Sequence, residues 1–228
     1  MKIAIIINSA EEESRDFIAN NDVGEYLIID WYVSHDARTA YLINHCAPTS
    51  FPCVVDLDTC MMCHNPTTLE EGLWGAKGYG NLIDARKTVA ILIDANTEKA
   101  KMAGVLWHPP SATEAPYNED TAFPLVEDWL RNYERAGAYI AEVLAASGDP
   151  FGTTGFMVKG SDDTVNGIKY LKSADDVTSF KTALTTQYLY ITNLGMILKT
   201  GGTYNEVTYT ALIDQDLTAL RAFVDPRV

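Results

Sequence analysis

The sequence predicts a mixed α+β fold, in which an α/β N-terminal third precedes a mostly helical remainder. Ile3 to Ile7 is a continuous apolar, mostly β-branched run, typical of a strand buried on both faces. Tyr26 to Val33 has the composition of a second strand. Beyond residue 80, apolar side chains recur with the 3.6-residue period of long amphipathic helices. These three observations set the fold class.

Between and after the first two strands, the sequence carries helix-start signals. The segment Ser9–Glu12 has the capping-box pattern, which predicts a helix from Ala10 to about Asn20. Ser34 and Asp36 can cap a second helix over Ala37–His45, because their side-chain oxygens can accept from unpaired N–H groups of the first turn.

A strand that begins after a proline follows. Phe51-Pro52 leads directly into Cys53–Val55, and proline is tolerated there because the first strand position needs no ladder N–H. Asp56–Asp58 can turn the chain back into a short strand around Cys60–Cys63. A further capping box, Thr67–Glu70, predicts the start of a third helix.

The resulting order β-α-β-α-β-β-α, with Ser50-Phe51-Pro52 before the third strand, resembles the thioredoxin/glutaredoxin-like fold over about residues 1–76. In that family the matching proline is cis and faces the active site, so the resemblance implies a cis-proline at Pro52. The family's redox CxxC lies between the first strand and the first helix. Here that position reads Ser9-Ala10-Glu11-Glu12-Glu13, without a cysteine, so ordinary thioredoxin catalysis is not expected.

The glycines of GLWGAKGYG mark a linker, so the first predicted domain spans residues 1–76 and the second part, 77–150, is a linker with helices. The apolar period predicts a helix over Leu82–Ala103, with Gly104 as its stop, and another over Phe123–Ala146.

Residues 151–228 are predicted to form a C-terminal domain of one hairpin and two helices. The hairpin pairs Phe156–Val158 with Gly167–Leu171, and the helices cover Ser173–Thr200 and Tyr209–Val224. The G-I-x-Y-x-K-S motif of this hairpin, followed by two helices, is similar to C-terminal domains of phage tail-fibre and tail-assembly proteins over about residues 156–225.

All four cysteines, Cys46, Cys53, Cys60 and Cys63, lie within eighteen residues, and His64 follows directly. They permit several kinds of site. A zinc site could use them, although only Cys60–Cys63 has CxxC spacing. CMMCH also has the spacing of a c-type haem attachment motif. A disulfide could join Cys53 to Cys60 or Cys46 to Cys63, and all four could instead be small buried hydrophobes.

Composition limits the function classes. The chain of 228 residues is 47% hydrophobic and 21% charged, which suits a packed core. A formal net charge of −14 argues against nucleic-acid and anionic-membrane partners. The N-terminus is too acidic for a signal peptide, so synthesis in a cytoplasm is expected. None of the common nucleotide, hydrolase or metalloprotease motifs occurs in the sequence.

We therefore expect a non-enzymatic structural component of a phage or phage-like particle, made in the host cytoplasm and located in the virion, in association with the tail. Its partners would be other structural proteins and further copies of itself, and no cofactor is expected, with zinc as the alternative. Trp74, Tyr79, Trp107 and Tyr117 are candidate interface residues, with packing between the domains as the equal alternative for these aromatic side chains. The competing prediction is a thiol-dependent oxidoreductase or metal-binding redox protein that uses the Cys46–Cys63 cluster.

Overall fold

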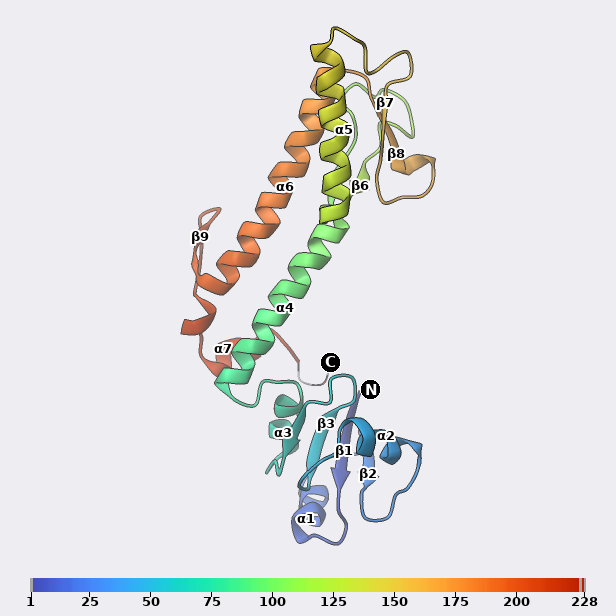
Figure 1. Cartoon of the computed structure of the whole chain (residues 1–228). Helices are drawn as coiled ribbons and strands as arrows, with labels where there is room; N and C mark the ends of the chain where they lie inside the picture. The colour runs from blue at the N-terminus through green and yellow to red at the C-terminus, as the bar shows by residue number, and fades with distance from the viewer. Residues whose placement is uncertain (1, 226, 228) are drawn as a thin grey trace. The chain divides into compact units, whose positions relative to one another are not determined.

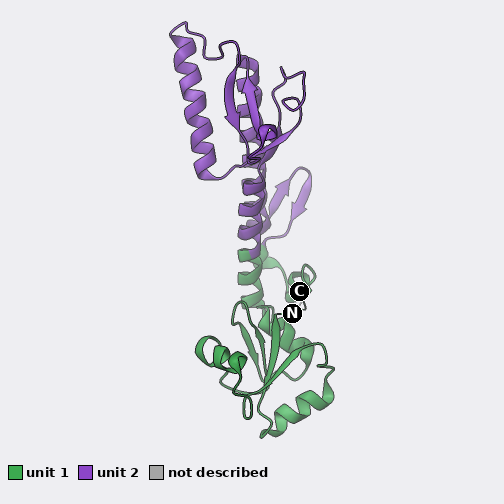
Figure 2. Ribbon diagram, turned by 90° about the vertical axis from the view of Figure 1, so that its right-hand side faces the viewer, with its two compact units in different colours: residues 1–91, 212–228 green, residues 92–211 purple. Residues whose placement is uncertain are grey.

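The computed structural model describes residues 2–225 and 227, so the outermost residues of the predicted domains 1–76 and 151–228 lie outside the described residues. The predicted α+β class is confirmed. The chain folds as two compact units, residues 1–91 with 212–228 and residues 92–211 (Figure 2). This division falls inside a helix, whereas the sequence placed boundaries at residues 76/77 and 150/151.

The first unit is built on a four-stranded sheet of β1 (Ile3–Ile7), β2 (Leu27–Asp30), β3 (Cys53–Asp56) and β4 (Met62–His64) (Figure 1). The strand order is β2-β1-β3-β4. β1 and β2 are parallel, whereas β3 is antiparallel to both β1 and β4. The carboxyl ends of β1 and β2 therefore lie at the same sheet edge as the start of β3.

Both faces of this sheet are covered, as the apolar run of β1 predicts. Ile3 and Ile5 pack with Phe17 of α1 (Glu12–Asn20) and with Leu73 of α3 (Leu69–Ala76). The alternate residues of β1 pack on the other face with Leu42 of α2 (Ala37–His45). Successive strand side chains point to opposite faces, so β1 is buried on both.

Of the N-terminal caps predicted for α1, α2 and α3, the cap of α2 is confirmed and the other two differ from the prediction. Asp36 caps α2, since its side chain accepts hydrogen bonds from the Arg38 and Thr39 amides. The predicted Ser9–Glu12 cap is wrong, because α1 begins after Glu11 without a side-chain cap and the Ser9 amide donates instead to Asp30. The box predicted at Thr67–Glu70 lies one residue later, where the Thr68 hydroxyl accepts from the Glu71 amide and the Glu71 carboxylate accepts from the Thr67 amide.

The N-terminal part of α4 (Leu82–Ala103) and the C-terminal segment complete the first unit. Tyr79, Ala85, Leu212 and Leu220 form one buried cluster. The helix predicted over Tyr209–Val224 is wrong beyond a short stretch. It is replaced by β10 (Val207–Tyr209), the 3₁₀ turn η2 (Leu212–Asp214) and the short helix α7 (Leu217–Arg221), which Asp216 caps.

The second unit holds the longest helices and three two-stranded sheets. Its elements are β5 (Val105–Trp107), β6 (Thr121–Phe123), α5 (Glu127–Ala145), β7 (Phe156–Lys159), η1 (Val165–Gly167), β8 (Ile168–Leu171), α6 (Ala174–Thr200) and β9 (Gly202–Tyr204). β5 pairs with β6, β7 with β8, and β9 with β10, each antiparallel. The predicted β7–β8 hairpin is confirmed, as is the Ser173 cap of α6, which accepts from the Asp176 amide.

The core of the second unit is aromatic and centres on Phe123. The ring of this fully buried residue lies 4.8 Å from Phe180 of α6, 5.8 Å from Trp107 of β5 and 5.9 Å from Tyr133 of α5. Phe123 was predicted to begin a helix but ends β6 instead, and Pro124 separates it from α5. The core therefore joins α5 and α6 to the β5–β6 ribbon.

Candidate functional site

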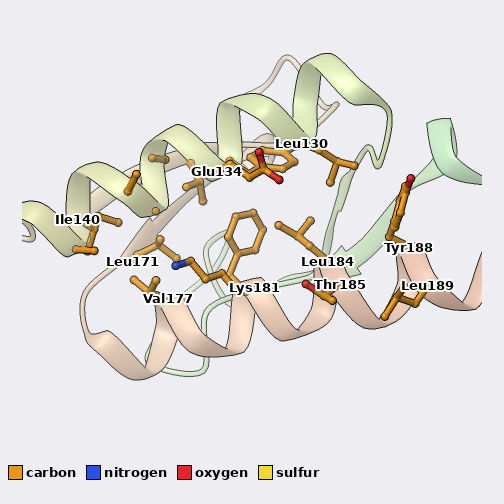
Figure 3. A pocket seen from close by; sticks show the side chains of 17 residues that line it. Leu130, Glu134, Ile140, Leu171, Val177, Lys181, Leu184, Thr185, Tyr188 and Leu189 are labelled. Carbon is orange, nitrogen blue, oxygen red and sulfur yellow. The ribbon is translucent and has the colours of Figure 1, made fainter.

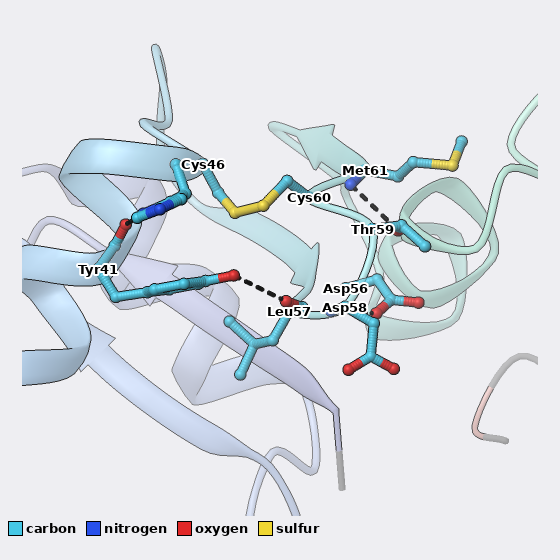
Figure 4. The surroundings of a disulfide bond; sticks show 9 residues. Tyr41, Cys46, Asp56, Leu57, Asp58, Thr59, Cys60 and Met61 are labelled. Atoms are coloured by element: carbon cyan, nitrogen blue, oxygen red, sulfur yellow. Dashed lines mark hydrogen bonds between the residues drawn. A yellow bond between two sulfur atoms is a disulfide. The ribbon is translucent and has the colours of Figure 1, made fainter.

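The four cysteines occupy different parts of the first unit, and two of them are bonded. Cys46 ends α2, and Cys60 lies in the turn before β4 with a positive φ of 55°. They form a disulfide with a Cα–Cα distance of 5.1 Å (Figure 4). The pairs predicted from spacing, Cys53–Cys60 and Cys46–Cys63, are therefore wrong. The reason is the tight turn, closed by the Cys60 amide donating to the Asp56 carbonyl at 2.8 Å, which presents Cys60 to the end of α2.

The other two cysteines, Cys53 and Cys63, are free and lie on opposite faces of the sheet. Val54 pairs directly with Cys63, and Cys53 with His64, so the two thiols point away from each other. Cys53 belongs to the apolar cluster under α2. Cys63 lies against Gly75 of α3, where an added Cβ would come within 2.6 Å of its sulfur. These two thiols therefore cannot form a disulfide with each other in this fold.

Burial also makes both free thiols poor nucleophiles. It raises the pKa of Cys53 to about 12, to which the neighbouring Cys63 also contributes. The pKa of Cys63 is raised by burial first and by the charge of Glu71 second. Because the thiolate is the form that attacks disulfides and binds metals, both groups stay protonated and unreactive near neutral pH.

The cysteine segment does not assemble a recognisable metal site. His64 is exposed, with its Nδ1 3.4 Å from the Ser50 carbonyl. Two of the candidate sulfur ligands are committed to the disulfide. Among residues 2–225 and 227, no three His, Cys, Asp or Glu side chains gather in a way that could hold a metal ion.

At the sheet edge where β1 and β2 end, the structure builds an ordered surface without a thiol. Asp30 is its centre, because its carboxylate accepts from the Ser9 amide at 3.2 Å and from the Tyr32 amide at 3.1 Å. Partial burial opposes ionisation of Asp30, but the hydrogen bonds from Ser9 and Tyr32 outweigh it and lower its pKa. The charged carboxylate thus fixes the loops that follow both strands.

The proline predicted to be cis lies at this same edge. The Phe51–Pro52 peptide bond is cis, and Pro52 directly precedes Cys53, which pairs with Ile6 of β1. The Phe51 ring packs 5.9 Å from Trp31. We call Ser9, Trp31, Tyr32, Phe51 and Pro52 the sheet-edge surface. Tyr32 is 65% exposed there, so this surface presents an aromatic side chain to solvent.

Two of the four candidate interface residues are core residues. Tyr79 and Trp107 are buried, and the Trp107 indole donates to Ser179 at 3.1 Å, so the expectation that these two form a contact surface is wrong. Trp74 is half-buried, with the Arg221 guanidinium 5.1 Å from its ring centre. Tyr117 is exposed and packs edge-on against Tyr170.

The second unit contains a groove that no sequence motif predicts. It lies between α5 and α6, has a volume of about 610 Å³, and is lined mainly by apolar side chains (Figure 3). Buried Ile140 of α5 and Leu184 of α6 lie along it, and Leu171 of β8 contributes to its base. The small residues Ala136–Ala138 and Ala141 of α5 are the only sequence signal for it, and they equally suit an ordinary helix.

A search for membrane-crossing helices among the described residues found none of sufficient length and apolarity. Comparison of the chain with family models, with curated proteins and with solved structures returned no match.

Proposed function

We propose that this chain is a non-enzymatic structural component of a phage or phage-like particle, associated with the tail and acting by docking to other proteins. In this proposal the N-terminal part of the first unit is a catalytically vacant thioredoxin-like domain. The virion is its place of action, and other structural proteins and further copies of the chain are its partners.

The observation that carries the non-enzymatic part of the proposal is the placement of the thiols. Electron exchange with a disulfide substrate needs an accessible thiolate and a second thiol close enough to resolve the mixed disulfide. Cys53 and Cys63 offer neither, since they are on opposite sheet faces and burial raises the pKa of both. The position of the family's redox motif is occupied by Ser9 and Ala10, whose amides bond to Asp30 and Asn8.

The thioredoxin-like part of the proposal is supported by topology. A sheet of order β2-β1-β3-β4, with β1 and β2 parallel and the other neighbours antiparallel, accommodates the β-α-β-α-β-β-α order. The cis peptide bond before Pro52 is what the resemblance implies at that position. These shared features concern the fold alone. Because one fold can host many functions, the function has to be inferred from the residues of the site.

The docking part of the proposal is supported by large apolar side chains that the fold leaves in solvent. Tyr32 lies on the sheet-edge surface of the first unit, and Leu189 lines the α5–α6 groove of the second while remaining 50% exposed. A groove of this size with an apolar lining is typical of a protein-binding or ligand-binding surface. The link to tails in particular rests on the similarity of the Gly167–Ser173 motif, which forms β8 and the cap of α6.

One observation favours the alternative, a thiol-dependent oxidoreductase. The Cys46–Cys60 disulfide is a two-electron couple, and Cys60 is only partly buried. Reduction would require an external dithiol that transfers two electrons and two protons to this bond. The alternative therefore rests on Cys46 and Cys60, and no longer on Cys53 and Cys63.

Turnover of insulin disulfides with dithiothreitol separates the two proposals. We expect the parent chain to reduce insulin no faster than dithiothreitol alone. Cys53 and Cys63 lie on opposite sheet faces with raised pKa values, and Cys46, which reduction would free, is only 1% exposed. The double variant Cys46→Ser/Cys60→Ser is the comparison and Cys63→Ser the matched control. A parent rate clearly above the dithiothreitol background, lost in the double variant and kept in Cys63→Ser, would establish the oxidoreductase and contradict the proposal.

A further inference from the structure

We propose that the α5–α6 groove binds an amphipathic α-helix of a partner protein, one whose apolar side chains are flanked by a basic and an acidic residue about one helical turn apart. This inference rests on the docking role proposed above and names the kind of partner. It is carried by the shape of the groove, by its apolar lining and by two charged side chains on its edges.

The groove has the length and the lining that a short helix requires. Along α5 it runs from Leu130 to Ala141, which is about 17 Å at 1.5 Å per residue, or three turns. Ile140, Phe180 and Leu184 supply apolar surface at its base. Helices that bind in such grooves insert apolar anchors at positions i, i+3 or i+4, and i+7, which span about 10.5 Å and so fit within this length.

The edges of the groove carry opposite charges that have no partner. Glu134 extends from α5, and Lys181 extends from α6 across the groove toward Gly137 of α5 (Figure 3). Within the described residues, neither side chain takes part in a hydrogen bond or an ion pair, whereas Arg131 nearby is paired with Glu127. A bound helix could supply each of these two charged side chains with an oppositely charged partner.

The spacing of the two charges predicts the spacing on the bound helix. The Lys181 side chain reaches α5 at Gly137, where an added Cβ would lie 2.7 Å from its Cε and 3.1 Å from its Nζ. Glu134 precedes Gly137 by three residues, or about 4.5 Å along the helix axis. A helix lying in the groove would thus meet Lys181 and Glu134 with an acidic and a basic side chain separated by three or four residues.

Charge also favours a different protein over a second copy of this chain. Each chain has a formal net charge of −14, so a second copy that approaches this groove is repelled unless other contacts between the copies offset the repulsion. A partner helix with one basic and one acidic residue can pair with both charges without that repulsion, provided that it belongs to a protein that is not itself strongly acidic.

The test uses the full chain and a designed peptide of about 18 residues that is helical in isolation. The peptide carries Leu anchors at i, i+3 and i+7, one Lys and one Glu four residues apart, and a fluorescent label for anisotropy titration. A scrambled peptide of the same composition controls for non-specific apolar binding. We expect binding of the designed peptide with a Kd of roughly 1–100 µM and none of the scrambled one.

Two variants place the binding site in the groove. Ala141→Trp fills the groove and is expected to weaken binding at least about tenfold. Asn132→Trp adds the same ring to the opposite side of α5 and should leave Kd unchanged. Glu134→Lys should weaken binding roughly three- to tenfold and should improve binding of a peptide whose Lys is replaced by a second Glu. As an exposed charge change, it keeps the test valid if Ala141→Trp fails to fold.

Equal weakening by both tryptophan variants, or no effect of Glu134→Lys on either peptide, would overturn the inference. So would dimerisation of the free chain that Ala141→Trp abolishes, because the groove would then be filled by a second copy. These outcomes leave the particle role untouched, since that role is measured by where the native protein is recovered.

Discussion

Loss of the Cys46–Cys60 disulfide is expected to lower the free energy of unfolding of the first unit by about 3 kcal/mol. The bond joins cysteines 14 positions apart, and closing a loop of about 15 residues in the unfolded chain is worth about 3 kcal/mol. The same bond ties the end of α2 to the turn that precedes β4. The measurement is urea-dependent hydrogen exchange of the β1 and β3 amides, with and without dithiothreitol.

The double variant Cys46→Ser/Cys60→Ser should equal the reduced parent and should no longer respond to dithiothreitol. Cys63→Ser is the matched control, because this thiol is unbonded and the variant should keep the full response to the reductant. A parent whose β3 exchange is unchanged by dithiothreitol would show that the bond does not hold this unit together.

Truncation of Phe123 is expected to destabilise the second unit by about 3–5 kcal/mol, the usual cost of removing a fully buried aromatic side chain. Phe123→Ala would remove the ring that Trp107, Tyr133 and Phe180 all contact, and would leave a cavity between α5 and α6. Urea-dependent exchange of the β8 and α6 amides measures this loss.

Phe223→Ala is the matched control, since Phe223 is 74% exposed and its truncation should change stability by less than about 0.5 kcal/mol. A loss for Phe123→Ala no larger than that of the control would contradict the assignment of Phe123 to the centre of the core.

Those parts of the fold that depend on local signals could be predicted from the sequence. The bounds of α2 were predicted because Asp36 offers a side-chain acceptor to the first turn. Those of α4 were predicted because Gly104, with φ of 77°, ends a segment whose mostly apolar positions recur with a helical period. The two-sided burial of β1 follows from its unbroken apolar run.

The errors have physical causes that differ from one segment to the next. In Thr203–Tyr209 the side chains alternate around Asn205-Glu206, both at positive φ, so a tight turn pairs β9 with β10. This hairpin was not predicted, and its last residue, Tyr209, was expected to begin a helix. That alternation was a usable signal. The partner of Cys60 was not predictable, because it depends on how α2 packs over the sheet.

Among the candidate site residues, too, features set by the local sequence could be predicted, whereas features set by packing between distant segments could not. Pro52 could be identified because a local motif surrounds it, whereas the burial of Tyr79 and Trp107 depends on segments far away in the chain. The α5–α6 groove depends on the separation of two helices that are adjacent in space and not in sequence. The spacing of residues along the sequence predicts neither the burial of Tyr79 and Trp107 nor the separation of α5 and α6.

Sedimentation of the material that contains the native protein, followed by peptide identification in each fraction, tests the central claim most directly. A structural component of a particle is expected to be recovered with other structural proteins in fractions of roughly megadalton size or larger, in a fixed ratio to them. Recovery of the protein only as a free monomer or dimer would contradict the account.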